Sequence, residues 1–427
     1  MVASESFRRI MRVRFHRGAA EIGGNCVEVA AANGQRIVLD VGRPLSAGWD
    51  DDVALPPVPG LGGNDPSLCG VVVSHPHLDH YGLVGAVDSS VPVFIGEEAS
   101  RLLAAASFFS SAGTPPIPSG FLRDRTPFTL GPFTITPFLN DHSAFDAYSL
   151  LIEADGGRLF YSGDLRAHGR KAALFERMVE APPIGVDVML LEGTHVRSDD
   201  SHDDAEFETE AELEDRFASL MSATSGAVVT LGSVQNLDRL VTVFRAARRT
   251  GRQLVVDLYG ATVASATRPS IPQVGFDGLR VYVPQRQRVR VKESQEFHRV
   301  RNLGEARVFI EELAANPGGF AFHVPSSTVY ELLRGGGLDV NGTAVWSMWE
   351  GYLTDPSGRR LMAALRDHDV PLVSMHTSGH ASVKDLQRLV QAFQPGRVVP
   401  MHSAATDRFA ALFPRVEQHH DNEWWTV

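Results

Sequence analysis

The sequence predicts an α/β protein of more than one domain, and three observations lead to this prediction. Short apolar runs rich in Val, Ile and Leu recur through residues 1–200 and 360–427, as is typical of strands covered on both faces. The middle of the chain instead has a strand–helix–strand pattern, which indicates a separate α/β domain. The length of 427 residues suffices for two or three domains.

Six apolar runs mark the strands expected in the two outer segments. Each run is bounded by turn residues, which favours short buried strands. The runs are RIVLDVG (36–42), CGVVVS (69–74), RLFYSGD (158–164), VDVMLLEG (186–193), VPLVSMH (370–376) and GRVVPMH (396–402). The Asp-Gly-Gly sequence at 155–157 lies between two apolar runs and predicts a β-hairpin there.

The middle segment begins with an acidic stretch at 199–215, which is interpreted as a solvated linker that runs into the start of a helix. GAVVTLGS (226–233) then predicts a strand. The following residues, 234–252, carry apolar side chains at spacings of three and four, as an amphipathic helix does. QLVVDLYGAT (253–262) is expected to return to a strand.

Composition limits the function only weakly. The net charge of −11 and the pI of about 5.8 argue against a generally basic surface, but they leave room for a local basic groove. Cys26 and Cys69 form no CxxC pair, so a reducing compartment is expected. The sequence has neither a signal peptide nor an apolar run long enough for a membrane span, and therefore predicts a cytoplasmic protein without a membrane partner.

The stretch HPHLDH, residues 75–80, follows an apolar run directly and contains four candidate metal ligands: His75, His77, Asp79 and His80. Imidazole and carboxylate donors suit zinc. Four donors this close cannot all bind one ion together with further ligands without strain, so the pattern favours two neighbouring ions. The alternatives are a surface histidine cluster and a single structural zinc.

Five further candidate side chains stand at the ends of apolar runs. They are His142, Asp164, Glu192, His380 and His402. One such residue by itself is more often a helix cap or a satisfied polar group. In one sheet of parallel strands, however, the strand ends on one edge converge, so we expect these five to meet.

Together these motifs resemble those of the metallo-β-lactamase fold. HPHLDH is similar to its HxHxDH signature, and His142 and Asp164 to its next two motifs. Glu192, SGH (378–380) and PMHS (400–403) resemble the extra motifs of the β-CASP branch. That branch includes ribonuclease J, the cleavage-factor nuclease of pre-mRNA 3′ processing and DNA-repair nucleases related to Artemis. The 238 positions between Asp164 and His402 (402 − 164) leave room for the β-CASP insertion.

The resemblance implies an αββα sandwich formed by residues 1–205 and 356–427, with an α/β β-CASP domain inserted at 206–355. It also implies two Zn²⁺ ions, bridged by Asp164. The remaining ligands would be His75, His77 and His142 on one ion and Asp79, His80 and His402 on the other.

The resemblance further implies catalytic roles for Asp79, Asp164, Glu192 and His380. A metal-bound hydroxide would attack phosphorus, and His380, held by Glu192, would protonate the departing oxygen. Asp40, at the end of RIVLDVG, would orient a histidine ligand.

Substrate contacts are expected from two further segments as well as from His380. In LGSVQNLDR, Ser233 and Gln235 stand at a helix start and could contact phosphate, with ordinary helix capping as the alternative. In WSMWEGYL, Ser347 is a candidate contact and Trp346 or Trp349 could stack a base, although a buried tryptophan would also fit. The basic stretch 280–294 is either a patch that follows a nucleic-acid backbone or an edge strand protected by charge.

These features predict a dinuclear zinc-dependent phosphodiesterase, a ribonuclease J-like endo- or exonuclease for which single-stranded RNA is the favoured substrate. A homodimer is compatible with the sequence. The alternatives are a small-molecule metallo-hydrolase, such as a cyclic phosphodiesterase or esterase, and a DNA nuclease. A non-catalytic partner is less favoured because all seven ligands are present. The sequence ends 25 residues after His402 (427 − 402), so the C-terminal domain of ribonuclease J is expected to be absent, as is the N-terminal RNA-binding module of archaeal cleavage-factor homologues.

Overall fold

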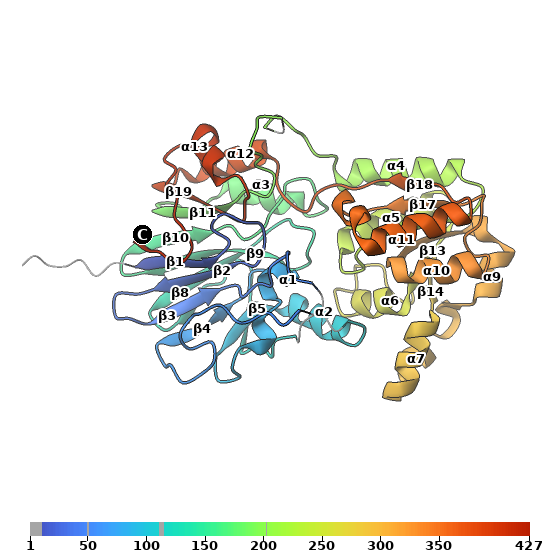
Figure 1. Ribbon diagram of the computed structural model, residues 1–427, viewed down its shortest axis with the longest axis horizontal. Helices are drawn as coiled ribbons and strands as arrows, with labels where there is room; N and C mark the ends of the chain where they lie inside the picture. The colour runs from blue at the N-terminus through green and yellow to red at the C-terminus, as the bar shows by residue number, and fades with distance from the viewer. Residues whose placement is uncertain (1–10, 49–50, 111–114, 202) are drawn as a thin grey trace, which may run out of the picture. The chain divides into compact units, whose positions relative to one another are not determined.

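The computed structural model describes residues 11–48, 51–110, 115–201 and 203–427. The chain divides into two compact units (Figure 1). Unit 1 comprises Met1–Leu103, Ser110–Glu206 and Gly379–Val427, and unit 2 comprises Ala104–Phe109 and Phe207–Ser378. Each unit contains both sheets and helices, which confirms the α/β class expected from the sequence.

Unit 1 is built on two β-sheets. The first has the strand order β20-β1-β2-β3-β4-β5-β6 and the second the order β19-β11-β10-β9-β8-β7. The strands of the first sheet are β1 (Arg12–Arg17), β2 (Cys26–Ala30), β3 (Arg36–Leu39), β4 (Leu68–Val72), β5 (Val93–Gly96), β6 (Gly120–Leu122) and β20 (Trp424–Thr426). Those of the second are β7 (Phe128–Leu130), β8 (Phe133–Leu139), β9 (Tyr148–Ala154), β10 (Gly157–Tyr161), β11 (Val188–Glu192) and β19 (Arg397–Met401).

The two sheets of unit 1 share one apolar core. Alternation along β1 turns Val13 and Phe15 inward, where they pack with residues of the second sheet such as Leu159. The next residue of β10, Phe160, faces outward and contributes to a second cluster with Phe175. That cluster joins the outer face of the second sheet to α3 (Ala172–Glu180) and α12 (Val383–Phe393), as Figure 1 shows. The other helices of these segments are α1 (Leu78–Tyr81), α2 (Glu97–Ser107) and α13 (Phe409–Leu412).

The hairpin predicted at 155–157 is confirmed. Strands β9 and β10 pair antiparallel, with Ala154 opposite Gly157. Asp155 and Gly156, the two residues between them, have φ of 54° and 83°. Positive φ at both central residues is the requirement of the turn that best matches the twist of paired strands.

Parallel strand pairs in unit 1 bring several chain segments to common edges. Strands β3, β4 and β5 run parallel in the first sheet, and β10, β11 and β19 run parallel in the second. The candidate ligands follow strands of both sheets. Of the five further candidates expected at one sheet, four stand at strand ends of the second sheet: His142, Asp164, Glu192 and His402, at β8, β10, β11 and β19. His380 follows no strand of either sheet, and the HPHLDH motif follows β4 of the first sheet.

Unit 2 contains one sheet of parallel strands in the order β15-β14-β13-β16-β12-β17-β18. Its strands are β12 (Val228–Leu231), β13 (Gln253–Asp257), β14 (Leu279–Tyr282), β15 (Arg307–Val308), β16 (Phe320–Val324), β17 (Thr343–Trp346) and β18 (Leu372–Ser374). Its helices are α4 (Glu210–Ala223), α5 (Leu237–Arg249), α6 (Leu258–Ser265), α7 (Gln285–Ser294), α8 (His298–Arg301), α9 (Ile310–Ala315), α10 (Ser326–Arg334) and α11 (Pro356–Asp367). No helix among the described residues combines the length and the hydropathy needed to cross a bilayer.

Two sequence expectations in unit 2 were wrong in detail. The strand expected at 253–262 ends at Asp257, whose carboxylate accepts a hydrogen bond from the Gly260 N–H at 2.8 Å and so begins α6. The edge-strand interpretation of 280–294 also fails. Strand β14 lies inside the sheet, between β15 and β13, and residues 285–294 form the helix α7.

The expected domain boundary at 355 also differs from the structure, in which unit 2 continues to Ser378. Helix α11 places Leu361 and Leu365 in the apolar core of unit 2. Strand β18 pairs parallel with β17, with Ala344 opposite Leu372. An apolar run predicts a strand but does not show which sheet the strand joins, which is why the sequence assigned 370–376 to the outer segment.

Candidate metal centre

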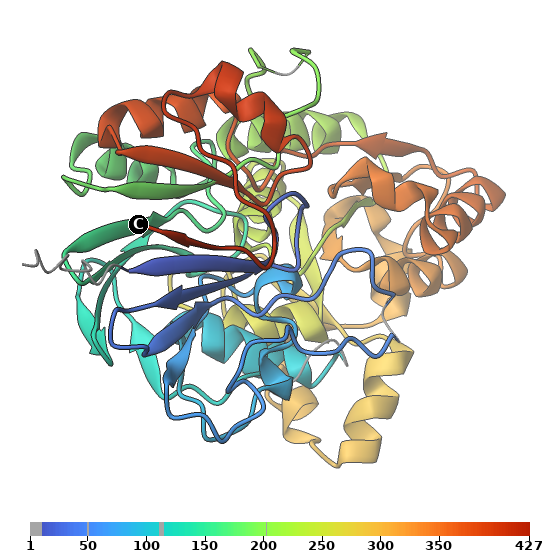
Figure 2. The ribbon, with the colours of Figure 1, turned by 60° about the vertical axis from the view of Figure 1, so that its left-hand side comes forward.

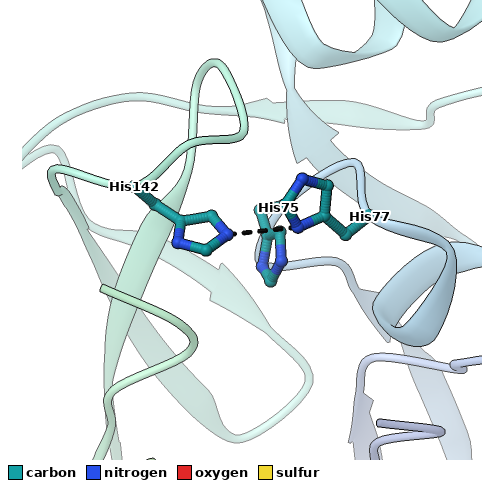
Figure 3. Close-up of side chains that lie close together, drawn as sticks. All are labelled: His75, His77 and His142. Carbon is teal, nitrogen blue, oxygen red and sulfur yellow. Dashed lines mark hydrogen bonds between the residues drawn. The ribbon is translucent and has the colours of Figure 1, made fainter. Parts of the chain in front are cut away.

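Three histidines from two strand ends of unit 1 form the first group of candidate ligands. His75 and His77 follow β4, and His142 follows β8. Figure 3 shows the three rings close together, and their centroids are 4.7–5.0 Å apart. His142 Nε2 lies 3.1 Å from His77 Nδ1. One ring nitrogen from each residue lies within 4.8 Å of the other two, a spacing that suits three ligands of one ion.

The second group contains Asp79, His80, Asp164 and His402, again with one donor atom each within 4.8 Å of the others. Asp164 Oδ2 lies 3.1 Å from His80 Nε2 and 3.8 Å from His402 Nε2. The same oxygen is 3.6 Å from His75 Nε2, which belongs to the first group. Asp164 therefore stands where one carboxylate could serve both groups.

Five buried donor atoms of these two groups lack hydrogen-bond partners among the described residues. They are Nε2 of His75, His80 and His402 and both carboxylate oxygens of Asp164. A buried polar atom without a partner is costly, and a bound cation would satisfy all of them together. The donor set of imidazoles and carboxylates is one that zinc prefers, so the residues present fit a zinc centre.

The backbone around this centre is strained and closely packed. Asp40 and His402 have φ of 59° and 49°, in the left-handed region that residues other than glycine rarely adopt. A β-carbon at Gly42 would collide with the carbonyl oxygen of Asp79, so the close approach of the two segments requires glycine there. Such strain is characteristic of functional sites.

The Asp40 carboxylate contacts the His80 ring and is held by hydrogen bonds from other side chains. Its Oδ2 is 2.7 Å from His80 Nδ1 and accepts hydrogen bonds from the Tyr161 hydroxyl at 2.6 Å and the Ser74 hydroxyl at 2.8 Å. Burial alone would lower the pKa of His80, but the Asp164 and Asp40 carboxylates raise this pKa well above its usual range. A carboxylate on Nδ1 fixes the ring so that Nε2 points toward the ligand group.

The other histidines are oriented by partners that the sequence analysis missed. His142 Nδ1 donates to the Gly379 carbonyl at 2.5 Å, and the Ser74 hydroxyl lies 3.0 Å from His75 Nδ1. Asn25 Nδ2 is 2.8 Å from His402 Nδ1. Ser74 directly precedes the HPHLDH motif, which could have drawn attention to it. Asn25 carries no signal, because it is 377 positions away from His402 in the sequence.

Burial keeps three of the histidines in the form that binds metals. It lowers the pKa of His77 to about 4. It also lowers the pKa of His75 and of His142 well below the usual range. Their rings are therefore neutral near pH 7, and a neutral imidazole is the form that ligates a metal.

Glu192 and His380 lie beside Asp164 and form the third group of candidate ligands. Glu192 ends β11 and accepts a hydrogen bond from the Leu165 N–H at 3.0 Å. Its Oε2 is 3.2 Å from His380 Nδ1, and the Thr194 hydroxyl is 3.1 Å from the same nitrogen. Burial alone would lower the pKa of His380, but Glu192 and Asp164 raise it to about 9.

The candidate substrate residues of unit 2 stand at the carboxyl ends of its strands. Ser233 is exposed, and the Gln235 side chain donates to the Tyr259 hydroxyl at 2.8 Å. Ser347 is buried and donates to the Met375 carbonyl. Trp349 is 64% exposed.

Only one of the two tryptophans considered for stacking is accessible. Trp346 is buried in the core of unit 2, and its indole N–H donates to the Trp349 carbonyl. The Trp349 ring packs edge-to-face on Tyr352, with their centroids 5.4 Å apart. A β-carbon at Gly351 would collide with the Trp349 indole, so the glycine allows the ring to lie close against the backbone.

Comparison with known protein families gives two matches. Residues 36–221 match the beta-lactamase superfamily domain. Residues 372–421 match the Zn-dependent metallo-hydrolase RNA specificity domain. The first match contains the HPHLDH motif, His142, Asp164 and Glu192, and the second contains His380 and His402.

Individual relatives agree with these matches. The chain is 23% identical over 409 residues to ribonuclease J 2 of Streptococcus pyogenes, covering 91% of this chain and 69% of that protein. It is 23% identical over 248 residues to ribonuclease J of Helicobacter pylori, covering 56% of this chain and only 35% of that protein. A crystal structure of an Enterococcus faecalis protein of unknown function shares the fold, with a TM-score of 0.77 over 98% of this chain and 100% of the other, at 19% identity. These two matched domains and the ribonuclease J relatives together support the ribonuclease J-like β-CASP branch of the metallo-β-lactamase superfamily.

Proposed function

We propose that the protein is a dinuclear zinc phosphodiesterase that hydrolyses single-stranded RNA. One observation carries this proposal: two neighbouring groups of donors, each within 4.8 Å, meet at Asp164, which belongs to the second group and lies 3.6 Å from His75 Nε2 of the first. Two ions that share one carboxylate can clamp the reacting oxygens of a phosphodiester.

Charge supports an anionic substrate. Two zinc ions would bring four positive charges, of which Asp79 and Asp164 would neutralise two, so the loaded site would attract a phosphodiester. When bound, zinc lowers the pKa of water toward about 7 and polarises phosphoryl oxygens. The histidines and aspartates of the chain supply the fixed geometry, since Asp40, Asn25 and the Gly379 carbonyl hold their rings.

We assign proton delivery to His380. A histidine held by a carboxylate can protonate a departing oxygen, and such acid catalysis contributes roughly 10²–10⁴-fold. Glu192 is buried and is itself anchored by the Leu165 N–H, so it holds the His380 ring in one orientation. His380 Nδ1 lies 3.8 Å from Asp164 Oδ2, so the His380 ring is next to the proposed centre.

Unit 2 would supply substrate contacts. Exposed Ser233 lies in the turn before α5, where helix N–H groups can attract phosphate. The exposed Trp349 ring offers a stacking surface for a base, a contact worth about 1–3 kcal/mol per base. Buried Ser347 is the weaker candidate, because its hydroxyl already has a partner. The names of the ribonuclease J relatives and of the RNA specificity domain favour RNA over a small molecule.

The test uses purified chain with its zinc content measured by mass spectrometry. We expect about two zinc ions per chain and cleavage of end-labelled single-stranded RNA. The Asp79→Ala/His80→Ala variant should lose most of its bound zinc and most of its RNA cleavage. His380→Ala should keep its zinc while the cleavage rate falls by roughly 10²–10⁴-fold, since it removes only the proton donor.

A matched control is Glu417→Ala/His419→Ala, which removes a carboxylate–histidine pair outside the three groups; its atoms are 3.1 Å apart. This variant should cleave RNA as the unmodified chain does. Equal cleavage by the unmodified chain and the Asp79→Ala/His80→Ala variant would refute the nuclease proposal. Faster cleavage of DNA of identical sequence would instead identify a DNA nuclease.

A further inference from the structure

Helix α7 carries the largest group of unpaired cations in unit 2. Its ten residues include Arg286, Arg288, Arg290 and Lys292 but only one acidic residue, Glu293. All four cations are exposed, and none forms an ion pair within the part of the chain that the structure describes. Other arginines of the unit do form ion pairs, such as Arg248 with Asp277 and Arg249 with Asp215.

This concentration of charge stands out in a protein of net charge −11. Like charges four residues apart destabilise a helix, so the pairs Arg286/Arg290 and Arg288/Lys292 each cost stability unless a partner balances them. We propose that α7 binds the phosphate backbone of single-stranded RNA. The inference rests on the proposed function for the choice of RNA and extends it to a binding element of unit 2.

Helix α7 begins at the carboxyl ends of the strands of unit 2, where the other candidate contacts also lie. It follows the carboxyl end of β14, as Ser233 follows that of β12 and Trp349 that of β17. Ligands of open parallel α/β sheets bind at the carboxyl ends of the strands. Figure 1 shows α7 projecting away from the other helices of unit 2, and Figure 2 shows the same gold helix from another side.

The first turn of α7 is anchored to the end of β13 and to α10, so the cations are presented on a rigid support. The Gln287 side chain donates to the buried Asp257 carboxylate at 2.7 Å. The Gln285 N–H donates to Glu331 at 2.9 Å, and Val291 is buried. A rigid support lowers the conformational entropy lost on binding.

The cations form two pairs on opposite sides of the helix, because residues two positions apart lie about 200° apart around its axis, so a flexible single strand must pass around α7 to contact both pairs. Arg286 and Arg290 are one helical pair at i and i+4, and Arg288 and Lys292 are another, so each pair spans about 6 Å along the helix axis. Arg290 and Arg299 both lie over the Phe108 ring, at 5.5 and 4.1 Å from its centroid. An apolar ring among arginines is a combination that single-stranded nucleic acids favour.

The experiment measures equilibrium binding of a fluorescent, phosphorothioate-substituted 20-nucleotide RNA, which resists hydrolysis, to zinc-loaded protein. The variant is Arg286→Gln/Arg288→Gln/Arg290→Gln/Lys292→Gln. The matched control, Arg245→Gln/Arg334→Gln/Arg360→Gln/Arg366→Gln, removes four exposed cations from other helices of unit 2. Zinc content and the circular-dichroism melting curve establish that both variants are folded.

We expect the α7 variant to bind RNA about tenfold more weakly or worse at 0.1 M salt, with little change in the control. The slope of log affinity against log salt should fall by about 3, because four phosphate contacts contribute roughly 0.7 each. Equal losses in the two variants would refute the proposal, since net charge alone would then explain binding. Displacement of the RNA by polyglutamate of equal charge would refute it too, in favour of an acidic protein partner.

The cleavage assay separates this proposal from the proposed function. A chain that binds RNA through α7 but cleaves none would contradict the nuclease and leave the α7 site standing. A chain that cleaves RNA but binds it equally well without the four cations would contradict the α7 site and leave the nuclease proposal standing.

Discussion

Asn25 illustrates how one side chain can decide whether a histidine is available to a metal. Its Nδ2 faces His402 Nδ1, while its Oδ1 is buried without a partner. With the amide atoms exchanged, His402 Nδ1–H donates to Oδ1, and the contact becomes a hydrogen bond between a donor and an acceptor. That orientation leaves His402 Nε2 unprotonated and directed at Asp164.

Replacing Asn25 therefore tests the orientation of His402. Asn25→Ala should weaken zinc binding about 10–100-fold, as the loss of a partner behind a metal ligand commonly does. Asn25→Asp should retain most of the affinity, because a carboxylate also accepts from Nδ1–H. The measurement is zinc per chain during titration with a chelator. Equal losses in the two variants would show that Asn25 acts by packing.

At the scale of elements, Asp257 joins a strand, two helices and a side-chain network. It ends β13 and begins α6, and it accepts hydrogen bonds from Gly260, Gln287 and Thr328. The carboxyl group is completely buried, and no cation faces it among these partners. Burial raises its pKa from 3.8 to about 6, although the hydrogen bonds partly oppose this shift.

Asp257 should make the stability of unit 2 depend on pH. The pKa is higher in the folded chain than in the unfolded chain, so the stabilisation is complete below about pH 4 and is lost as pH rises through about 6. A difference of about two pKa units corresponds to roughly 3 kcal/mol. Asp257→Asn should lack this dependence.

Urea unfolding of both proteins between pH 4 and pH 8 measures the effect. The amide places a donor against the Gln287 and Thr328 donors, which gives a destabilisation that is the same at every pH. The free energy of unfolding of the variant minus that of the unmodified chain should therefore increase by roughly 3 kcal/mol over this range. A constant difference would show that Asp257 titrates normally.

At the scale of the whole molecule, all seven proposed zinc ligands lie in unit 1, although they span residues 75 to 402. Zinc that binds only the folded state stabilises it by RT ln(1 + [L]/Kd), about 4 kcal/mol at 1,000 times Kd. This stabilisation should appear in the unit that holds the ligands.

Hydrogen exchange with and without zinc checks this distribution. Amides of β4, β10 and β19 should exchange more slowly when zinc is bound, whereas amides of β12, β13 and β16 should change little. Removal of zinc with a chelator should reverse the effect. Equal protection of the strands of unit 2 would mean that the two units unfold together or that unit 2 also binds zinc.

Much of the candidate site could be predicted from the sequence because its donors are concentrated in motifs. HPHLDH places four donors in six residues, and each later candidate follows an apolar run. The contacts of Asp40 and Asn25 with the histidines could not be predicted with the same detail. These contacts join positions 40 and 377 residues apart. Asp40 and His80 follow the paired strands β3 and β4, whereas the contact of Asn25 with His402 depends on how the two sheets pack.

The fold shows the same limit at particular elements. The type of most strands followed from apolar runs and turn residues, as the hairpin at Asp155 shows. The membership of β18 in the sheet of unit 2 did not, because its run resembles those of unit 1. The arginines at 286, 288 and 290 alternate with other residues, as they would on an exposed strand. The segment is nevertheless a helix, in which Gln287 contacts Asp257 and Val291 is buried.

By itself, then, the sequence determined the chemistry: which donors are present, that they suit zinc, and that a second α/β segment interrupts the first. Local spacing carries that information because ligand type and periodicity are properties of neighbouring residues. Only the tertiary structure decided which partners orient the donors, such as Asn25 and the Gly379 carbonyl, and that the basic stretch of unit 2 is a helix. Those features depend on the packing of segments distant in the chain, which no local pattern encodes.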